Sequence, residues 1–283
     1  MPKKIGPYTV TLLETGEFAL DGGAMFGVVP KTLWEKTNPT DSMNRIDMAL
    51  RIMLIQTQGK NILVDTGAGE DWDEKLKKIY RIDHSRFSLK KSLEACGLSF
   101  QDITDVILSH LHFDHAGGAT YNVGNEFKPN FSNATYYVQK KQWEWAMKPA
   151  EKDRASYFKE KLSALQKGKL KMLEGEQELF PGISVLVTHG HSPFHQVVKV
   201  TDGKNTLLYC ADLIPTSSHI PIPYNMGYDN FPLYTLEEKR TILERVVKEN
   251  WILCFEHDPT IPAATVFKNP KTGRYSMGEK IFF

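Results

Sequence analysis

Four side chains that commonly bind metal ions lie within residues 110–115, whose sequence is HLHFDH. The chain has only nine histidines, so chance is a poor explanation for three of them in one short segment. Residues two apart in an extended backbone point to the same side, so His110 and His112 can share one ion. The turn that continues through Asp114 and His115 offers both side chains to a second ion. This one segment can therefore contribute ligands to two metals.

Three more candidate ligands are distant in sequence but similar in context. His191, Asp212 and His257 each come just after a short apolar segment that is typical of a buried strand, and so does His110. Loops at the ends of strands bring scattered side chains to one crevice of a sheet-built scaffold. We therefore expect these residues to gather at one site.

The elements that must position these residues are short strands and a few helices. Two sheets packed face to face with helices outside would bury the apolar face of each element. We predict a single domain over residues 1–283. The expected strands include 48–56, 61–64, 103–109, 183–187, 206–210 and 251–254, and the expected helical segments are 87–95, 140–167 and 235–249.

The order of these motifs resembles that of the metallo-β-lactamase-fold hydrolase superfamily. The resemblance extends from the segment 61–67 (NILVDTG) to residue 257, and it implies an α+β fold, the four-layer αββα sandwich. It also implies the ligands of two metals. They would be His110, His112 and His191 for the first metal, Asp114, His115 and His257 for the second, and Asp212 as a bridge between them.

Two further residues are expected to position ligands rather than to bind metal. Asp65, in an Asp-Thr-Gly turn, would orient a ligand imidazole, although a purely structural role in the turn is also reasonable for this residue type. His195, four residues after His191, is expected to be an outer hydrogen-bond partner.

The predicted chemistry is hydrolysis. Two divalent ions about 3.5–4 Å apart hold a bridging hydroxide near neutral pH, so no serine or cysteine nucleophile is needed. We expect Asp212 and Asp114 to be catalytic, the first by setting the metal separation and the second by passing a proton to the leaving group, although ligation alone explains Asp114 equally well. Zinc is the expected metal, and Mn, Fe or Co suit the same ligands.

Within the superfamily, the motifs look most like the branch of N-acyl-homoserine lactonases and methyl-parathion-hydrolase-like esterases. We therefore expect the opening of lactones or the cleavage of hydrophobic carboxylic esters. Many lactonases of this branch carry a tyrosine where this chain has Pro215, which leaves Tyr224, Tyr228 or His219 as substitutes. A phosphotriesterase or phosphodiesterase of the same fold is the alternative. A di-iron redox protein would carry a glutamate at His112, which disfavours that third reading.

Two loops with hydrophobic side chains that look exposed are candidates for substrate binding. Met25 and Phe26 lie in a glycine-rich segment, and His219 and Tyr224 lie in a proline-bearing segment. Together these residues could cover an acyl chain. The same segments could equally pack on the edge of the fold or at a homodimer interface.

Composition excludes several other classes of protein. The 283 residues are 41% hydrophobic and 24% charged, with a formal net charge of +1. This charge gives no electrostatic case for a nucleic-acid partner. No apolar run approaches the ~20 residues of a membrane span, and the N-terminus lacks the apolar stretch of a signal peptide. We therefore expect a cytoplasmic enzyme that acts on a small molecule, without a membrane or nucleic-acid partner.

Overall fold

The computed structural model describes residues 2–124 and 126–283. The chain forms two compact units. Unit 1 comprises Met1–Phe18 and Leu50–Gly175, and unit 2 comprises Ala19–Ala49 and Glu176–Phe283. The single domain expected over 1–283 remains a prediction.

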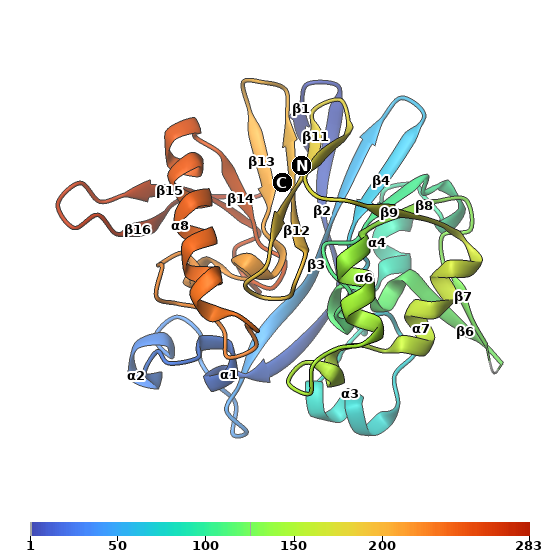
Figure 1. Ribbon diagram of the computed structural model, residues 1–283, viewed down its shortest axis with the longest axis horizontal. Helices are drawn as coiled ribbons and strands as arrows, with labels where there is room; N and C mark the ends of the chain where they lie inside the picture. The colour runs from blue at the N-terminus through green and yellow to red at the C-terminus, as the bar shows by residue number, and fades with distance from the viewer. Residues whose placement is uncertain (1, 125) are drawn as a thin grey trace. The chain divides into compact units, whose positions relative to one another are not determined.

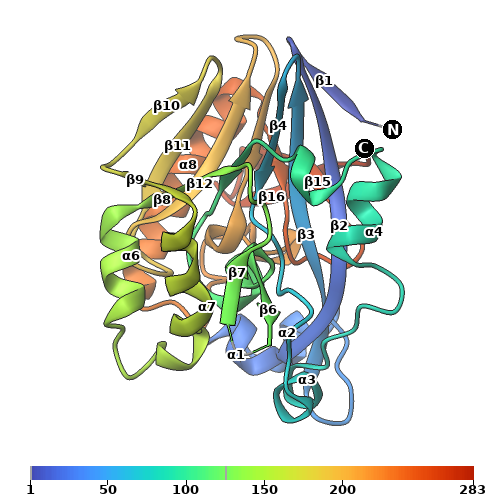
Figure 2. The ribbon, with the colours of Figure 1, turned by 90° about the vertical axis from the view of Figure 1, so that its right-hand side faces the viewer.

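A mixed seven-stranded sheet supplies the scaffold of unit 1 (Figures 1 and 2). Its strands β4, β5, β8 and β9 run parallel, whereas β1 and β2, and β3 and β4, form antiparallel pairs. Because β4 and β5 are parallel neighbours, the segments that follow them start at the same edge of the sheet. In order, the strands are β1 (Lys3–Ile5), β2 (Tyr8–Asp21), β3 (Arg45–Thr57), β4 (Lys60–Val64), β5 (Asp105–Ile107), β8 (Thr135–Gln139) and β9 (Lys169–Leu173).

Short helices surround this sheet. They are α3 (Glu74–Tyr80), α4 (Leu89–Ala95), α5 (Phe113–Ala116), α6 (Lys140–Met147) and α7 (Lys159–Ala164), with a separate β-hairpin of β6 (Thr120–Val123) and β7 (Glu126–Pro129). The helical segment expected over 140–167 contains two α-helices rather than one, because α6 ends at Met147 and α7 begins at Lys159. Pro149 explains the break, since a proline disfavours helical backbone in the residue before it.

A second mixed sheet of seven strands belongs to unit 2. All of its neighbouring pairs are antiparallel except β13 and β14, in which Tyr209 is paired with Cys254. The chain therefore leaves β13 and β14 at the same edge of this sheet. In order, the strands are β10 (Gln177–Phe180), β11 (Ile183–Thr188), β12 (His195–Thr201), β13 (Thr206–Tyr209), β14 (Ile252–Cys254), β15 (Ala263–Lys268) and β16 (Tyr275–Ile281).

The parallel connection from β13 to β14 is made by α8 (Pro232–Glu249), which covers one face of the second sheet (Figure 1). Proline suits the first position of a helix, and the helix ends at Asn250 in a left-handed conformation. Ile242, Leu243 and Val246 form its apolar stripe and pack against buried residues of the sheet. Unit 2 also contains α1 (Gly22–Phe26) and α2 (Lys31–Trp34).

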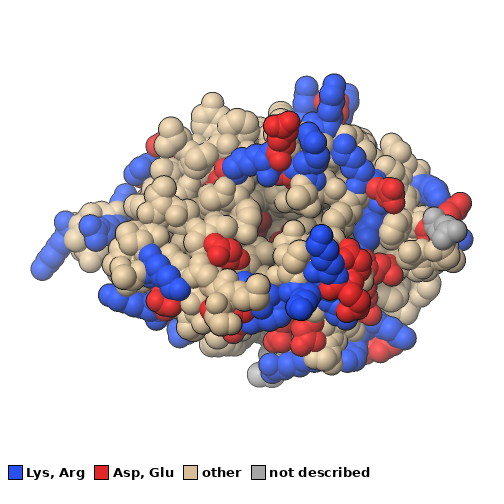
Figure 3. Space-filling view, turned by 90° about the horizontal axis from the view of Figure 1, so that it is seen from below, with Lys and Arg blue, Asp and Glu red and all other residues tan. Residues whose placement is uncertain are grey.

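The surface of the protein carries both signs of charge. On the face drawn in Figure 3, basic and acidic side chains are interspersed among uncharged ones, in keeping with the net charge of +1. Within residues 2–124 and 126–283, no helix has the length and apolar character needed to cross a membrane.

Candidate metal centre

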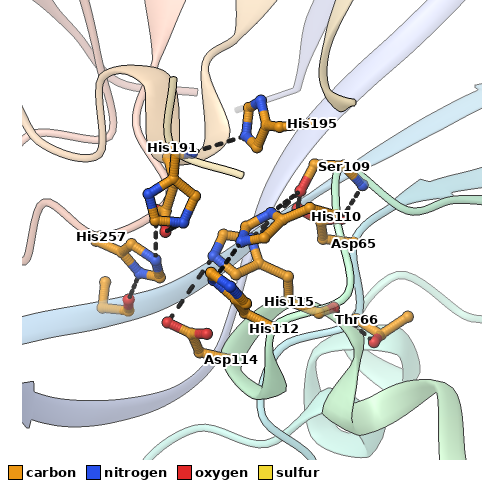
Figure 4. Close-up of polar contacts among 12 residues, drawn as sticks. Asp65, Thr66, Ser109, His110, His112, Asp114, His115, His191, His195 and His257 are labelled. Atoms are coloured by element: carbon orange, nitrogen blue, oxygen red, sulfur yellow. Dashed lines mark hydrogen bonds and ion pairs between the residues drawn. The ribbon is translucent and has the colours of Figure 1, made fainter. Parts of the chain in front are cut away.

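The histidine motif of unit 1 occupies the loop after β5 and the first turn of α5. Its side chains are almost completely buried, with 0% of His110 and His115, 4% of His112 and 6% of Asp114 exposed. The Nε2 atom of His110 lies 2.9 Å from Nδ1 of His112 (Figure 4). Buried imidazoles as close as this need a shared proton or a shared cation, because two lone pairs facing each other repel.

Asp65 connects the end of β4 to this motif. Its carboxylate accepts hydrogen bonds from the Ser109 amide and hydroxyl, both at 2.6 Å, and lies 3.1 Å from Nδ1 of His115 (Figure 4). The Ser109 hydroxyl in turn lies 3.1 Å from Nδ1 of His110. Holding Nδ1 as the protonated nitrogen gives Nε2 of each ring the lone pair that a metal ligand needs. The geometry thus supports the orienting role predicted for Asp65.

Two glycines after the motif permit a close backbone approach. A Cβ atom on Gly117 would lie 2.1 Å from the carbonyl oxygen of Ala68, and one on Gly118 would lie 2.2 Å from that of Thr66. These distances are far below any van der Waals contact, so only glycine fits. The pair therefore allows the turn after Asp65 to pack directly against the end of the motif.

In unit 2, the parallel strands β13 and β14 bring Asp212 and His257 to one sheet edge, and the loop between β11 and β12 adds His191. All three are buried, and each oxygen of Asp212 faces one imidazole. The Oδ2 atom lies 3.0 Å from Nε2 of His191, and Oδ1 lies 3.2 Å from Nε2 of His257. A carboxylate in this position can bridge two metals, each of which also takes an imidazole.

The outer nitrogen of each of these two rings is held by the protein. Nδ1 of His191 lies 3.0 Å from Oδ1 of Asp229, and Nδ1 of His257 lies 2.9 Å from the carbonyl oxygen of Ala49. A metal-binding histidine typically donates its second nitrogen to a carboxylate or carbonyl. Burial alone would lower the pKa of His191, but the Asp212 and Asp229 carboxylates outweigh burial and raise that pKa to about 9.

His195, predicted to be an outer partner, lies at the start of β12. Its Nε2 accepts a hydrogen bond from the Asp212 amide at 3.3 Å, and its Nδ1 lies 2.7 Å from the Thr188 hydroxyl. Both nitrogens are thus used within unit 2. This arrangement supports a role in fixing the backbone of Asp212.

Other residues that position the loop of His191 were not predicted from the sequence. Glu238 of α8 accepts hydrogen bonds from the amides of His189 at 2.6 Å and Gly190 at 3.0 Å. A Cβ atom on Gly190 would lie 2.3 Å from the Thr235 amide nitrogen, so glycine is required where this loop meets α8. A glutamate on a helix, such as Glu238, is usually expected to be exposed to solvent. Nothing in the sequence near Glu238 indicates that it contacts the loop.

The residues expected to contact substrate belong to unit 2. Contrary to expectation, Met25 and Phe26 are not exposed, because 1% and 0% of their surfaces are accessible. Phe26 is stacked on Trp34 and on His219, with ring centroids 5.1 and 4.6 Å apart, and Tyr224 meets its edge at 6.2 Å. These apolar rings bury one another, which explains why the segment is not open to solvent.

His219 has partners within unit 2 for both ring nitrogens. Nδ1 lies 2.8 Å from the Thr216 hydroxyl, and Nε2 lies 2.8 Å from the carbonyl oxygen of Met25. Burial lowers the pKa of His219 to about 4. Substrate contacts by Met25, Phe26, His219 and Tyr224 stay predictions, and His219 has a structural role that accounts for its burial.

A cavity of about 470 Å³ lies within unit 1, between the segment after Gly69 and the start of α7. Its wall includes the aromatic rings of Trp72, Phe127, Tyr157 and Phe158. Tyr157 lies against His112, with ring centroids 4.8 Å apart. Trp72 also packs against the ring of Phe113, inside the histidine motif, at 5.1 Å. A cavity with an aromatic wall is therefore separated from the candidate ligand His112 by the ring of Tyr157.

The donor set of both units fits divalent metals. Each unit contributes a group of buried imidazole and carboxylate ligands, the donor types that suit zinc and similar ions. In addition, an oxygen atom of the protein lies within hydrogen-bond distance of Nδ1 in three of these rings. The oxygen belongs to Asp65 for His115, to Asp229 for His191 and to the Ala49 carbonyl for His257, which leaves Nε2 of each ring for a metal. Buried histidines that served only packing would not require this repeated orientation.

Comparison with known proteins identifies the family. Residues 51–257 match the model of the metallo-beta-lactamase superfamily. The chain belongs to the metallo-β-lactamase superfamily. It is 30% identical over 231 residues to an N-acyl homoserine lactonase of Bacillus cereus, a match that covers 76% of this chain and 83% of that relative.

Solved structures of this superfamily are similar over nearly the whole chain. A probable metal-dependent hydrolase from Staphylococcus aureus has a TM-score of 0.87 and 28% sequence identity, covering 99% of this chain and 100% of that one. An N-acyl homoserine lactone hydrolase with its product N-hexanoyl-L-homoserine bound at the catalytic metal centre has a TM-score of 0.67 and 26% identity, covering 88% of this chain and 93% of that one.

These matches confirm the fold class predicted from the sequence, with two mixed seven-stranded sheets and helices. This protein is a metal-dependent hydrolase of the superfamily. Its two groups of histidine and aspartate side chains are consistent with a dinuclear site. The carbonyl oxygen of Pro215, a residue for which the resemblance led us to expect a tyrosine, accepts a hydrogen bond from the His257 amide at 3.0 Å. The backbone of Pro215 thus helps to hold a candidate ligand.

Proposed function

We propose that this protein opens lactones or cleaves hydrophobic carboxylic esters at a dinuclear metal centre. The observation that carries the proposal is the aromatic cavity of unit 1, whose wall residue Tyr157 packs on the candidate ligand His112. The 30% identity to an N-acyl homoserine lactonase supports the same substrate class. The cavity gives an acyl chain a place to bind near a candidate metal ligand.

The proposed ligands come from both units and repeat the assignment that the resemblance implies. His110, His112 and His191 would hold one metal, Asp114, His115 and His257 the other, with Asp212 shared between them. We propose zinc as the metal, with Mn, Fe or Co as substitutes. When bound, two such ions activate water and polarise the scissile carbonyl.

The protein's own residues would control geometry and proton movement. Asp212 presents one oxygen to each of two imidazoles, so it sets the spacing of their ligand atoms. Asp114 lies at the first turn of α5, and its Oδ2 is 3.8 Å from Nε2 of His115. Its carboxylate would take a proton from the attacking water and pass it to the alkoxide that leaves when the ester bond breaks. Asp65 and Asp229 would keep the rings of His115 and His191 in orientation.

The cavity favours an uncharged acyl chain over a nucleic-acid backbone. Burial of each methylene contributes about 0.8 kcal/mol, so each two-carbon extension that fits should raise kcat/KM by at most about tenfold. The gain should stop once the chain fills the cavity. The small-molecule substrate and the cytoplasmic location both stay predictions.

A chain-length series tests this proposal. Metal-loaded protein would be assayed on acyl-homoserine lactones from four to twelve carbons, beside aryl esters, a phosphotriester and a phosphodiester. Leu76 lines the cavity from α3, so Leu76→Trp should abolish the gain with chain length while leaving short lactones unchanged. Ile79→Trp is the matched control, because Ile79 is on the same helix, is 47% exposed and does not line the cavity. A flat profile in the wild type, or a preference for phosphodiester, would overturn the proposal.

A further inference from the structure

Unit 2 also contains a cavity, and none of the candidate metal ligands lines it. Its volume is about 520 Å³, which is within the range of small-molecule sites. It lies where the loop Pro221–Tyr224, the helix α8 and the hairpin of β15 and β16 meet. Figure 1 shows this hairpin beside α8. We call this cavity the hairpin pocket.

One wall of the hairpin pocket is apolar and firmly held. It is formed by Pro221, Ile222 and Pro223 of the loop. The buried ammonium of Lys239 donates hydrogen bonds to the carbonyl oxygens of Pro221 at 2.9 Å and Tyr224 at 2.7 Å. These bonds fix the loop from behind. The wall is therefore formed before any ligand binds, which lowers the entropic cost of binding.

The rest of the hairpin pocket is largely basic. Arg240, Lys268 and Arg274 line it, with Glu244 as the acidic counterpart. Lys268 and Glu244 are 3.5 Å apart, but both are exposed to solvent, so this ion pair is weak. Among the described residues, the Arg274 guanidinium has no partner in an ion pair or hydrogen bond. Arg240 also lies 3.8 Å from Glu237. The positive charge of Arg274 is therefore the one that no acidic side chain balances, and it gives the hairpin pocket an excess of positive charge.

The cavity of unit 1 provides a useful contrast. Its lining has three basic residues, Arg154, Lys159 and Lys161, balanced by Asp71, Asp73 and Glu160. Charge balance of that kind suits a neutral ligand. The excess in the hairpin pocket instead selects an anion.

We propose that the hairpin pocket binds a small amphipathic carboxylate. The hydrocarbon or aryl body would lie against the proline and isoleucine wall, and the carboxylate would face Arg274 and Arg240. A guanidinium matches a carboxylate with two parallel hydrogen bonds, which a lysine or a neutral group cannot reproduce. Two sources share this chemistry: a fatty or aryl carboxylic acid, and the ring-opened product of a lactone. The second source rests on the proposed function, whereas the pocket itself does not.

Calorimetry with octanoate on the metal-loaded protein tests the binding. Octanamide serves as the neutral probe of equal length, and inorganic phosphate as an anion without an apolar body. We expect octanoate alone to bind, and Arg274→Gln to raise its Kd by about tenfold, the effect of one charge-assisted hydrogen bond. Arg245→Gln is the control, because Arg245 is an arginine of α8 that belongs to the same unit but does not line the pocket.

The position of the ligand is tested separately, because a carboxylate could also bind at the metals. Crystals soaked in 8-bromooctanoate should show anomalous bromine signal at the hairpin pocket in the wild type and none there in Arg274→Gln. Bromine found only elsewhere, equal binding of octanamide, or an unchanged Kd in Arg274→Gln would overturn the proposal.

A ring-opened N-acyl homoserine and its parent lactone identify the source of the ligand. If the product binds with the same dependence on Arg274 and the lactone does not, the product is a natural occupant. If octanoate binds and the product does not, the pocket serves carboxylic acids from elsewhere. Lactone turnover is measured on the same samples, so loss of the proposed function would appear as missing turnover while the Arg274-dependent binding of octanoate persists.

Discussion

The stability of the metal-free protein should depend on pH through His191. The carboxylates around this ring raise its pKa from 6.5 to about 9 despite burial. A group whose pKa is raised by folding stabilises the fold fully below its unfolded pKa, here 6.5, and that contribution is lost as pH rises through 9. At about 1.4 kcal/mol for each pH unit between the two values, the loss is about 3.5 kcal/mol.

Lys239 has the opposite effect on the free energy of unfolding, over an overlapping pH range. Burial lowers its pKa from 10.5 to about 7, so above pH 7 the unfolded chain holds a proton that the folded chain does not. Stability therefore rises by about 1.4 kcal/mol per pH unit from pH 7 upward. Between pH 7 and 9, the two contributions nearly cancel. The free energy of unfolding of the wild type should therefore be almost constant between pH 7 and 9. That of His191→Gln should rise by about 3 kcal/mol over the same range.

Urea unfolding of chelator-treated protein at pH 7, 8 and 9, followed by circular dichroism, measures this difference. His84→Gln is the control, because His84 is in unit 1 and contacts neither carboxylate around His191. It should keep the flat profile. If His191→Gln and the wild type show parallel profiles, the carboxylates do not hold a proton on His191 and the reasoning is refuted.

Four shorter predictions concern the metal centre. Asp212→Ala should reduce the metal content below two ions per chain on elemental analysis and lower turnover by orders of magnitude, and near-normal activity would exclude a bridging role. His195→Ala should cost less, since His195 acts through the Asp212 amide; an equal loss in both variants would place His195 among the ligands. Asp65→Ala should weaken metal affinity by about 10- to 100-fold in a chelator competition, and unchanged affinity would leave Asp65 a structural turn residue. Gly190→Ala should destabilise the fold by about 1–3 kcal/mol in urea unfolding, because its Cβ would meet the backbone of α8.

The sequence predicted the strands that carry the candidate ligands because each is a local apolar run. The segments expected at 183–187, 206–210 and 251–254 are β11, β13 and β14, with ends shifted by at most one residue. The expected helix 235–249 lies within α8. Ligands that follow such strands could be found from the sequence because both the strand and the ligand are local features.

Partners that are distant in sequence could not be predicted in the same way. Nδ1 of His257 meets the carbonyl of Ala49, 208 residues away, and Nδ1 of His191 meets Asp229, 38 residues away. No period or motif records such a contact. The glycines around Met25 and Phe26 predict an exposed loop, but Asp21 accepts a hydrogen bond from the Ala24 amide and starts the short helix α1. Packing against Trp34 then buries the segment, which composition alone does not reveal.

The helix α8 shows how one element can serve both the core and the site. Its apolar stripe packs on the second sheet, as amphipathic spacing predicts. Lys239 interrupts that stripe, three residues before Ile242, yet it is completely buried. A buried lysine requires acceptors, and the loop carbonyls of Pro221 and Tyr224 provide them. One residue earlier, Glu238 holds the amide before His191. The charged positions of this helix therefore fix two loops, and the hydrogen bonds that they make to those loops offset the cost of their desolvation.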